Sequence, residues 1–406
     1  METKKQYLYL ESYVFIFMQD HAALLYDSFA GKTYRLDLNG HVRRMLTDLL
    51  DLKNMYVITL SSEELEEPYV RAFVRLIRNY FLGDLIPVDI CPVKPVLFPP
   101  VFDLQLEKAE AENLKNSEVL KNLNDMTIYV TDQCTRPENG KLSGAFSRQT
   151  RFCKYHEPPH YIDIQLLKDF FRNQPIRDIP FHLVGGDWSL YPYWEELTAF
   201  FSSFSNVEYF VYYTHFLAQA ERWRDLKCVV LIDYPVQDAV VEALLERIQC
   251  EDLSVVLEFI VKDEETFLHA LSYQERYREV NIVPVYDNNW DFFYHRICTS
   301  EEDLAEIDLS KKDIFRNQIL NMNFFGNLVI DCSGDIYTHL TESPLGNIEK
   351  DSLKASVMKA LDKEKSAWFR IRNVEPCKSC VYQWLCPPPS SYEAVIGKFN
   401  LCQIHK

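Results

Sequence analysis

The sequence predicts a mixed α/β protein made of three units in series. Short strands and helices alternate between about Met126 and Val285, a rhythm typical of a parallel sheet covered by helices, which predicts a (β/α) barrel, partial or complete. A proline-rich stretch over 91–100 marks a linker after the first unit, and cysteines crowd into the last thirty residues. We expect the units at 1–90, 124–323 and 324–406, with a linker and helix over 91–123.

Composition excludes several classes of function. The chain has 406 residues, of which 47% are hydrophobic and 14% aromatic, which is ample material for a packed core. Its net charge of −17 argues against broad binding of nucleic acid or of an anionic membrane surface. No apolar run approaches the ~20 residues of a membrane span, and the first residues do not resemble a signal peptide. We therefore expect a soluble, cytoplasmic protein.

The first unit is predicted to be a small αβ domain. Tyr13–Phe17 and Ala23–Tyr26 read as a hairpin, and Lys32–Leu36 reads as a third short strand. Helices are expected over His41–Leu52 and Pro68–Leu82, since proline suits a first helical turn and a glycine follows the second segment. Three strands followed by helices resemble a winged-helix fold.

The second and third units follow from periodicity. After a charged helix at about Asp103–Leu123, we expect strands at Thr127–Thr131, Pro180–Val184, Glu208–Tyr213, Cys228–Asp233, Val255–Val261 and Asn281–Val285. Helices are expected at Asp163–Asn173, Tyr193–Phe204 and Ser352–Trp368. Ser333-Gly334 predicts a hairpin turn between Leu328–Asp331 and Asp335–Thr338.

The cysteines divide into two groups. Seven of the 11 are scattered and are best read as reduced, mostly buried thiols. The other four are Cys377, Cys380, Cys386 and Cys402, with five residues between the second and third and fifteen between the third and fourth. Four thiolates at such spacing suit one tetrahedral zinc or one [4Fe–4S] cluster, and the spacing alone leaves both open.

Two further motifs come before these cysteines in the sequence. They are Gly334-Asp-Ile-Tyr337 in the hairpin and Gly346-Asn-Ile348 after it. Together with the cysteines, they resemble the SPASM extension of radical-SAM (S-adenosylmethionine) peptide-modifying enzymes. The resemblance implies that the four cysteines hold one auxiliary [4Fe–4S] cluster, with zinc as the alternative. His339, Asp351 and Ser390 replace further cysteines of that family. One cluster is therefore expected where relatives carry two.

The reaction centre of such enzymes is degenerate in this sequence. Ile128–Cys134 resembles the strand and first cysteine of the CxxxCxxC motif, but an insertion follows, and Cys153 and His156 stand near the old motif's end. Gly185-Gly186-Asp187 resembles the GGE motif that contacts the amino group of SAM, with Asp in place of Glu. The intact CxxxCxxC motif is absent from the sequence. The resemblance therefore implies no catalytic residues and no bound SAM. A makeshift cluster on Cys134, Cys153 and His156 is the alternative.

The first unit resembles the PqqD-like domain that takes a leader peptide as an added strand. In this sequence the edge would be Lys32, Thr33, Tyr34, Arg35 and Leu36, and the groove helix would present Val70, Arg71, Val74, Arg75 and Arg78. The arginines suit an acidic leader or are a solvated face. DNA binding is disfavoured, because residues 1–90 carry 10 basic and 13 acidic side chains.

Taken together, these features resemble the pseudo-radical-SAM proteins found beside genuine radical-SAM enzymes in a ribosomal-peptide maturation system with Gly-Gly leaders. The resemblance implies a non-catalytic scaffold that binds a precursor leader, an active radical-SAM partner, or both. Two alternatives remain open: a divergent SAM- or iron–sulfur-dependent peptide-modifying enzyme, and a zinc-stabilised interaction protein.

Overall fold

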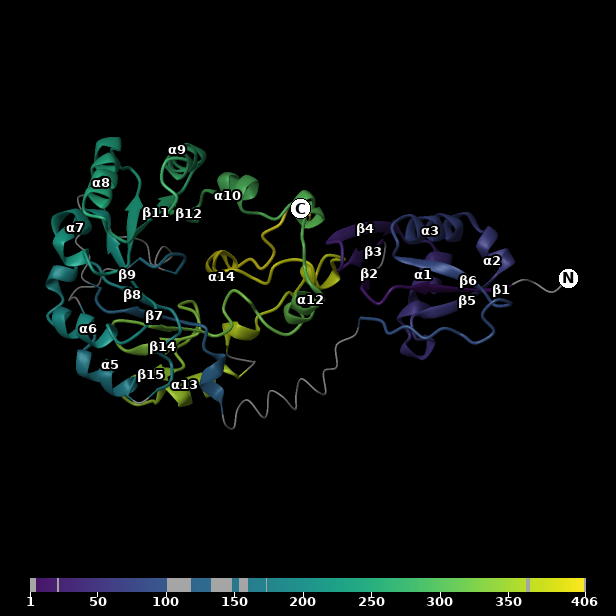
Figure 1. The fold of residues 1–406 in the computed structure, drawn as a ribbon, viewed down its shortest axis with the longest axis horizontal. Helices are drawn as coiled ribbons and strands as arrows, with labels where there is room; N and C mark the ends of the chain where they lie inside the picture. The colour runs from purple at the N-terminus through teal and green to yellow at the C-terminus, as the bar shows by residue number, and fades with distance from the viewer. Residues whose placement is uncertain are drawn as a thin grey trace.

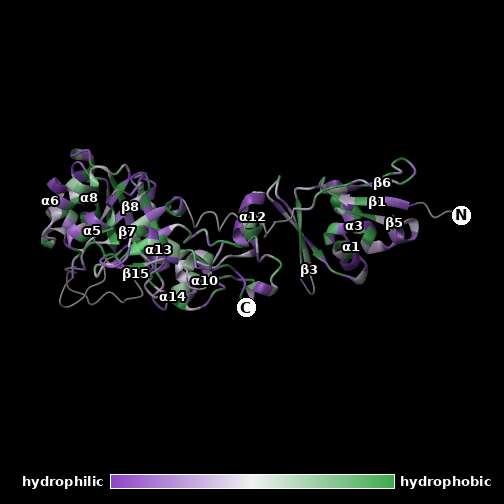
Figure 2. Cartoon of the chain, turned by 90° about the horizontal axis from the view of Figure 1, so that it is seen from below, coloured by the Kyte–Doolittle hydropathy of each residue, from purple (hydrophilic) through white to green (hydrophobic). Residues whose placement is uncertain are grey.

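The structure is a computed structural model that describes residues 5–19, 22–100, 118–132, 148–152, 160–172, 174–362 and 366–404 (Figure 1). It is mixed α/β, as predicted. The first unit lies at one end, the large parallel sheet lies at the other, and α12 (Lys311–Asn317) lies between them in both views (Figures 1 and 2). No helix in these ranges combines the length and the apolar character needed to cross a membrane.

Two small antiparallel sheets form the first unit. One has the order β2-β3-β4, with β2 at Val14–Met18, β3 at Ala22–Asp27 and β4 at Lys32–Asp37, which confirms the three expected strands. The other has the order β5-β1-β6, with β1 at Lys5–Leu10, β5 at Val57–Ser61 and β6 at Gly83–Pro87. The helices are α1 (Gly40–Leu50), α2 (Ser62–Glu66) and α3 (Pro68–Asn79).

Strands β5 and β6 were not predicted. β6 contains glycine, aspartate and proline, which are depleted in strands, and it is an edge strand, where such residues are tolerated. Gly83 is needed there, because a Cβ would lie 2.1 Å from the carbonyl oxygen of Tyr9 on β1. The pairing with β1, rather than local propensity, makes this segment a strand.

The large sheet has nine strands in the order β12-β11-β10-β9-β8-β7-β13-β14-β15. Strands β7 to β13 are mutually parallel neighbours, and β14 and β15 extend the sheet antiparallel. The strands are β7 (Asp125–Tyr129), β8 (Phe181–Val184), β9 (Val207–Tyr212), β10 (Cys228–Asp233), β11 (Val255–Val261), β12 (Val280–Pro284), β13 (Asn327–Ile330), β14 (Asp335–Tyr337) and β15 (Gly346–Asn347). The sheet is open, with β12 and β15 at its edges.

Helices follow most strands, as expected for this alternation. They are α5 (Ile164–Phe170), α6 (Trp194–Phe201), α7 (Tyr213–Ala218), α8 (Asp238–Cys250), α9 (Glu264–Gln274), α10 (Trp290–Arg296), α11 (Glu301–Ala305), α12, α13 (Leu353–Ala360) and α14 (Ser391–Ile396). The apolar faces of most of these helices and one face of the sheet share one large buried core, whereas α11 and α12 pack in a separate cluster. A smaller cluster lines the opposite face, and it includes Tyr129, Phe210 and Leu231. We call this second side the inner face of the sheet.

Two predicted helices differ from the observed ones. The helix expected at Ser352–Trp368 ends at Ala360, and Ala367–Phe369 is a separate 3-10 turn. Trp368 is fully buried there, and its indole nitrogen donates to the carbonyl of Asn327, so tertiary packing overrides continuation of the helix. Most of the helix expected at 103–123 lies outside the described residues.

The first unit docks on the C-terminal unit through one face of the β2-β3-β4 sheet. Phe15, Leu24 and Tyr26 share a buried cluster with Val381 and Leu385, which belong to the cysteine-bearing segment. An ion pair between Arg35 on β4 and Glu301 on α11 lies at the rim of this contact. The two ends of the sequence are therefore packed against each other.

Candidate functional site

The four cysteines of the C-terminal unit lie on three loops. Cys377 begins a one-turn 3-10 helix that ends at Ser379, and Cys380 follows it directly. These two and Cys386 are buried, whereas Cys402 is half-buried. Cys402 is held by a short pairing in which Gln403 donates its backbone N–H to the carbonyl of Thr299.

Electrostatic interactions relate every pair of these four thiols. Burial raises the pKa of Cys377 and Cys380 above that of a free thiol, and it raises the pKa of Cys386 to about 12. Each further thiolate raises the pKa of its neighbours, whereas the Arg372 guanidinium lowers it. The four thiols therefore lie close enough to affect one another's pKa, although the first and last are 25 residues apart in the chain.

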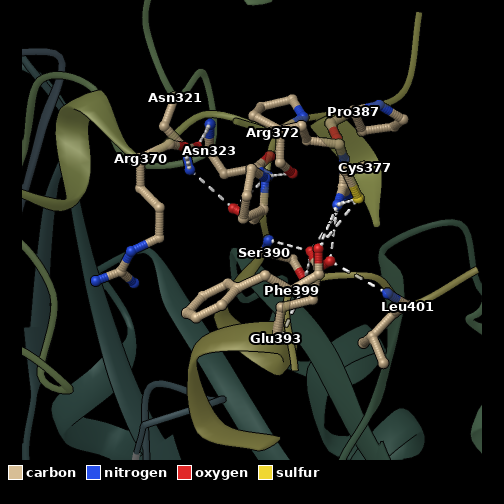
Figure 3. A network of polar contacts seen from close by, with 12 residues as sticks. Asn321, Asn323, Arg370, Arg372, Cys377, Pro387, Ser390, Glu393, Phe399 and Leu401 are labelled. Carbon is tan, nitrogen blue, oxygen red and sulfur yellow. Dashed lines mark hydrogen bonds and ion pairs between the residues drawn. The ribbon is translucent and has the colours of Figure 1, made fainter. Parts of the chain in front are cut away.

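A buried ion pair holds the cysteine loops together (Figure 3). Arg372 and Glu393 form two N–H···O contacts of 2.9 and 3.2 Å, and both side chains are almost fully buried. Arg372 also donates to the sulfur of Cys377 at 3.7 Å and to the carbonyl of Pro387, next to Cys386. Glu393 accepts from the backbone N–H of Leu401, next to Cys402. One ion pair thus contacts three of the four cysteines or their immediate neighbours.

Asparagine side chains fix the proline run that follows Cys386. Asn321 donates to the carbonyl of Pro389 at 2.8 Å, and Asn323 donates to that of Pro388 at 3.0 Å. Prolines have no N–H to satisfy, so these buried carbonyls need partners from outside the run. The loop after Cys386 is therefore held by side chains from the segment just before β13.

The chemistry of this donor set fits a thiolate-bound centre. Four sulfurs suit zinc or [4Fe–4S], and the N–H group that Arg372 aims at Cys377 is the kind of donor that tunes the potential of iron–sulfur clusters. Within the described ranges, no three His, Cys, Asp or Glu side chains stand in the geometry of metal ligands. The four cysteines thus lie near one another and have side chains suited to binding a metal. That they bind one metal centre remains a prediction.

A fifth thiol lies beside this group and was missed in the sequence. Cys298 is buried, and its pKa rises to about 11 through burial and the nearby Cys402 thiolate. The pairing of Thr299 with Leu401 and Gln403 brings it there. Cys298 lies far from the four cysteines in the sequence, and no local motif surrounds it. It was therefore not identified from the sequence.

The structure describes some residues of the degenerate SAM motif and not others. Cys134, Cys153 and His156 are outside the described residues. Gly185 and Gly186 follow β8 as expected, and Asp187 accepts from the N–H and hydroxyl of Ser189. A Cβ at Gly185 would lie 2.5 Å from the ring of Trp188, which is buried and donates to the carbonyl of Phe210. This turn therefore packs a tryptophan.

The described end of the insertion lies on the inner face of the sheet. Phe152 is buried against the ring of Tyr212, and the Arg151 guanidinium lies 5.3 Å from the ring centre of Phe210. Gln149 exchanges two hydrogen bonds with the backbone of Tyr286, beyond β12. The chain's own side chains thus occupy part of this face.

The predicted peptide-binding residues are divided between the surface and the core. Val70 and Val74 on α3 belong to the buried core of the first unit, whereas Arg71, Arg75 and Arg78 are exposed. Arg71 pairs with Glu66 and Arg78 with Asp84, each within the first unit. The apolar stripe of α3 therefore faces inward, and its arginines face solvent.

On β4, alternate side chains have different environments. Arg35 pairs with Glu301, while Lys32 is exposed and Thr33 is half-buried. Tyr34 and Leu36 are half-buried and pack on the core of the first unit. β4 pairs with β3 alone among the described strands, so its other edge is free in the ranges described.

An aromatic surface beside β4 was not predicted. Tyr80 and Phe81 directly follow α3 and are 52% and 81% exposed. The ring centre of Tyr34 on β4 lies 4.6 Å from that of Tyr80. Phe29, in the turn before β4, is 86% exposed and contacts Tyr13. We call Tyr13, Phe29, Tyr34, Tyr80 and Phe81 the aromatic patch.

A cavity of about 590 Å³ lies at the carboxyl ends of β10 and β11. Ligands commonly bind at this edge of parallel sheets. His269 lies in its wall, with its ring nitrogens 2.8 Å from the Tyr234 hydroxyl and 2.7 Å from the Asp238 carboxylate. The three residues come from separate loops and helices without a recognisable motif, so the sequence did not reveal them.

A scan against protein-family models finds no match to this chain, and no curated protein matches it.

Proposed function

We propose that the protein is a non-catalytic scaffold of peptide maturation, related to radical-SAM proteins with a SPASM extension. In this proposal the first unit is a PqqD-like, winged-helix-like domain that binds the leader of a ribosomally made precursor peptide. The parallel sheet is a partial barrel that no longer binds SAM, and it offers a surface to an active radical-SAM enzyme. Cys377, Cys380, Cys386 and Cys402 hold one [4Fe–4S] cluster, which orders the C-terminal unit.

The observation that carries the peptide-binding part is the free edge of β4 beside the aromatic patch. An unpaired strand edge offers backbone N–H and C=O groups to an extended peptide, while pockets beside it select side chains. Contiguous exposed aromatics are uncommon on a protein surface that has no partner. The exposed arginines of α3 favour an acidic leader.

The strain at Phe81 supports a binding role for this patch. Its φ of 58° is in the left-handed region, which a bulky side chain adopts at an energetic cost. The Tyr13 hydroxyl donates to the carbonyl of Phe81 and fixes this conformation. A strained, exposed aromatic residue is typical of a functional surface.

The absence of catalysis is supported by the sequence and by the inner face. A radical-SAM site needs three cysteines on one cluster and room for SAM. Phe152 and Arg151 occupy part of the inner face, and the GGE-like turn packs Trp188. These contacts favour a scaffold over an enzyme.

Binding of a fluorescent leader peptide to the full-length protein tests the proposal. We expect saturable binding that weakens at least tenfold when Tyr80 and Phe81 are both replaced by alanine. Tyr69→Ala is the matched control, because Tyr69 is 57% exposed on the same helix but about 16 Å away along its axis. Equal binding by the double variant would refute the assigned surface.

Metal analysis tests the cysteine site independently. About four iron atoms with acid-labile sulfide per chain are expected after anaerobic reconstitution. About one zinc and no iron would instead identify a zinc-stabilised interaction protein. Formation of 5′-deoxyadenosine from SAM under reducing conditions would show a divergent enzyme and reject the scaffold.

A further inference from the structure

A second, smaller cavity of about 280 Å³ lies between the inner face and the hairpin of β13 and β14. Its walls combine apolar side chains with several ionisable ones. They include Asp125, Arg148, Arg151, Glu258 and His339, which come from two strands, the end of the insertion and the segment after β14. A volume of this size exceeds that of a single water, about 30 Å³, several-fold.

Glu258 is the exceptional residue in this cavity. It lies on β11 and is only 8% exposed, yet its carboxylate makes no hydrogen bond or ion pair with any residue that the structure describes. After burial, the charges that act on its pKa are Arg151, which lowers it, and Glu208, which raises it. A buried carboxylate without donors is unfavourable by several kcal/mol, so such a group is usually satisfied by something bound beside it.

Two of the other ionisable groups around Glu258, Arg151 and His339, already have partners, and burial raises the pKa of Asp125 above its usual value. Arg151 donates to the Thr127 hydroxyl at 3.4 Å and lies over the Phe210 ring. His339 accepts at Nδ1 from the backbone N–H of Thr341, and burial together with Arg370 and Arg148 lowers its pKa to about 4. At neutral pH the histidine therefore carries no charge that would pair with Glu258.

Arg148 contributes the opposite charge to the same cavity. Its side chain is exposed, it makes no ion pair with a described residue, and it also lines the adjoining cavity of about 470 Å³ next to Cys332. Among the described residues, the cavity thus has a buried carboxylate without a hydrogen-bond partner and an exposed guanidinium without an ion pair. Two opposite charges facing one small space match a ligand that carries both signs.

We propose that this cavity binds a free α-amino acid, whose ammonium group contacts Glu258 and whose carboxylate contacts Arg148. The ammonium supplies the donors that the buried carboxylate lacks, and the guanidinium receives the carboxylate as a bidentate partner. This site is separate from β4 and from the cysteines, so it does not depend on leader binding or on a metal.

Calorimetric titration and thermal unfolding of the full-length protein test this site. The probes are free L-amino acids, tested singly, and the N-acetyl and amide derivatives of any that bind. We expect at least one free amino acid to bind saturably and to raise the melting temperature. Its N-acetyl derivative, which has no ammonium group, and its amide, which has no carboxylate, should each bind at least tenfold more weakly.

Two variants locate the site. Glu258→Gln keeps the shape of the side chain and removes its charge, and Arg148→Gln removes the exposed cation. Each should weaken binding at least tenfold, whereas Asp291→Asn, at a fully exposed acid, should not change it. Cooperative unfolding of each variant confirms that it is folded.

Three results would overturn the proposal. These are no binding by any free amino acid, undiminished binding by Glu258→Gln, and equal binding of the N-acetyl derivative. Equal binding of the amide would reassign the site to the amino terminus of a peptide and would remove the role of Arg148.

Discussion

The hydroxyl group of Tyr26 accepts a hydrogen bond from the backbone N–H of Leu309 at 2.6 Å and donates one to the carbonyl of the same residue at 2.9 Å. Tyr26 lies on β3, and Leu309 lies in the segment between α11 and α12. A single phenol therefore ties the first unit to the segment between α11 and α12, within the apolar cluster that this segment shares with the C-terminal unit.

Tyr26→Phe should weaken this docking. The ring would still fill its place, but the polar backbone groups of Leu309 would lose their buried partner, at a cost of about 1–3 kcal/mol. Small-angle scattering should show a larger radius of gyration, and urea unfolding should show a lower midpoint. Tyr56→Phe is the control, because its hydroxyl donates to Val14 within the first unit and its loss should leave the docking intact. An unchanged radius in Tyr26→Phe would mean that apolar packing alone holds the units.

Phe81→Gly should stabilise the fold while it weakens leader binding. Glycine adopts a φ of 58° without steric conflict, so relief of strain is expected to add about 1 kcal/mol to the free energy of unfolding. The exposed ring would be lost from the aromatic patch, and the dissociation constant for the leader should rise. Thermal unfolding and fluorescence anisotropy on the same preparation measure both effects. If the variant were less stable and bound the leader with unchanged affinity, the backbone strain at Phe81 would have no role in leader binding.

Stability should fall as the pH rises through the titration range of Glu258. Burial raises the pKa of this carboxyl to about 7, compared with about 4.3 in the unfolded chain. Between these values the folded state binds more protons than the unfolded state, so the free energy of unfolding decreases with pH, by about 3 kcal/mol in total. Above about pH 7 this loss is complete.

Glu258→Gln should remove this pH dependence in the absence of amino acids. At about pH 8 the variant should be more stable than the parent protein, and at about pH 5 the difference should be smaller. Urea unfolding at both pH values measures it. Glu246→Gln, at an exposed acid, is the control. A variant that is less stable than the parent at pH 8 would show that Glu258 is paired in solution.

Glu393→Gln should destabilise the cysteine-bearing unit. Removing one charge leaves Arg372 buried without its counter-ion, which typically costs about 3–5 kcal/mol. Retention of the metal should fall with it, because the same pair holds the loops of Cys377, Cys386 and Cys402. Glu242→Gln breaks the solvent-exposed pair with Arg276 and should leave the free energy of unfolding almost unchanged. Equal metal retention in both variants would show that metal binding does not depend on the buried ion pair.

Periodicity predicted most of the fold. The strands of the parallel sheet were expected within a few residues, because buried parallel strands read as short apolar runs between helices. β6 was not predicted, since its composition opposes a strand and only its partner β1 imposes one. The early end of α13 follows from the burial of Trp368, which is also a tertiary effect.

The candidate site was only partly visible in the sequence. The spacing of the four cysteines identified them, whereas Cys298 joins them through a long-range pairing. Val70 and Val74 share a helix face with residues of the core, and a sequence pattern alone does not say whether such a face turns inward or lines a groove. Glu258 left a usable signal, a single charge within the apolar run Val255–Val261.

The docking of the first unit has a consequence for synthesis. Its apolar face, formed by Phe15, Leu24 and Tyr26, is covered by Val381 and Leu385, which leave the ribosome more than 350 residues later. At elongation rates of roughly 5–20 residues per second, the nascent unit exposes this face for about 20–70 s before its cover arrives. A chaperone that shields the emerging hairpin during this interval would therefore raise the yield of native protein.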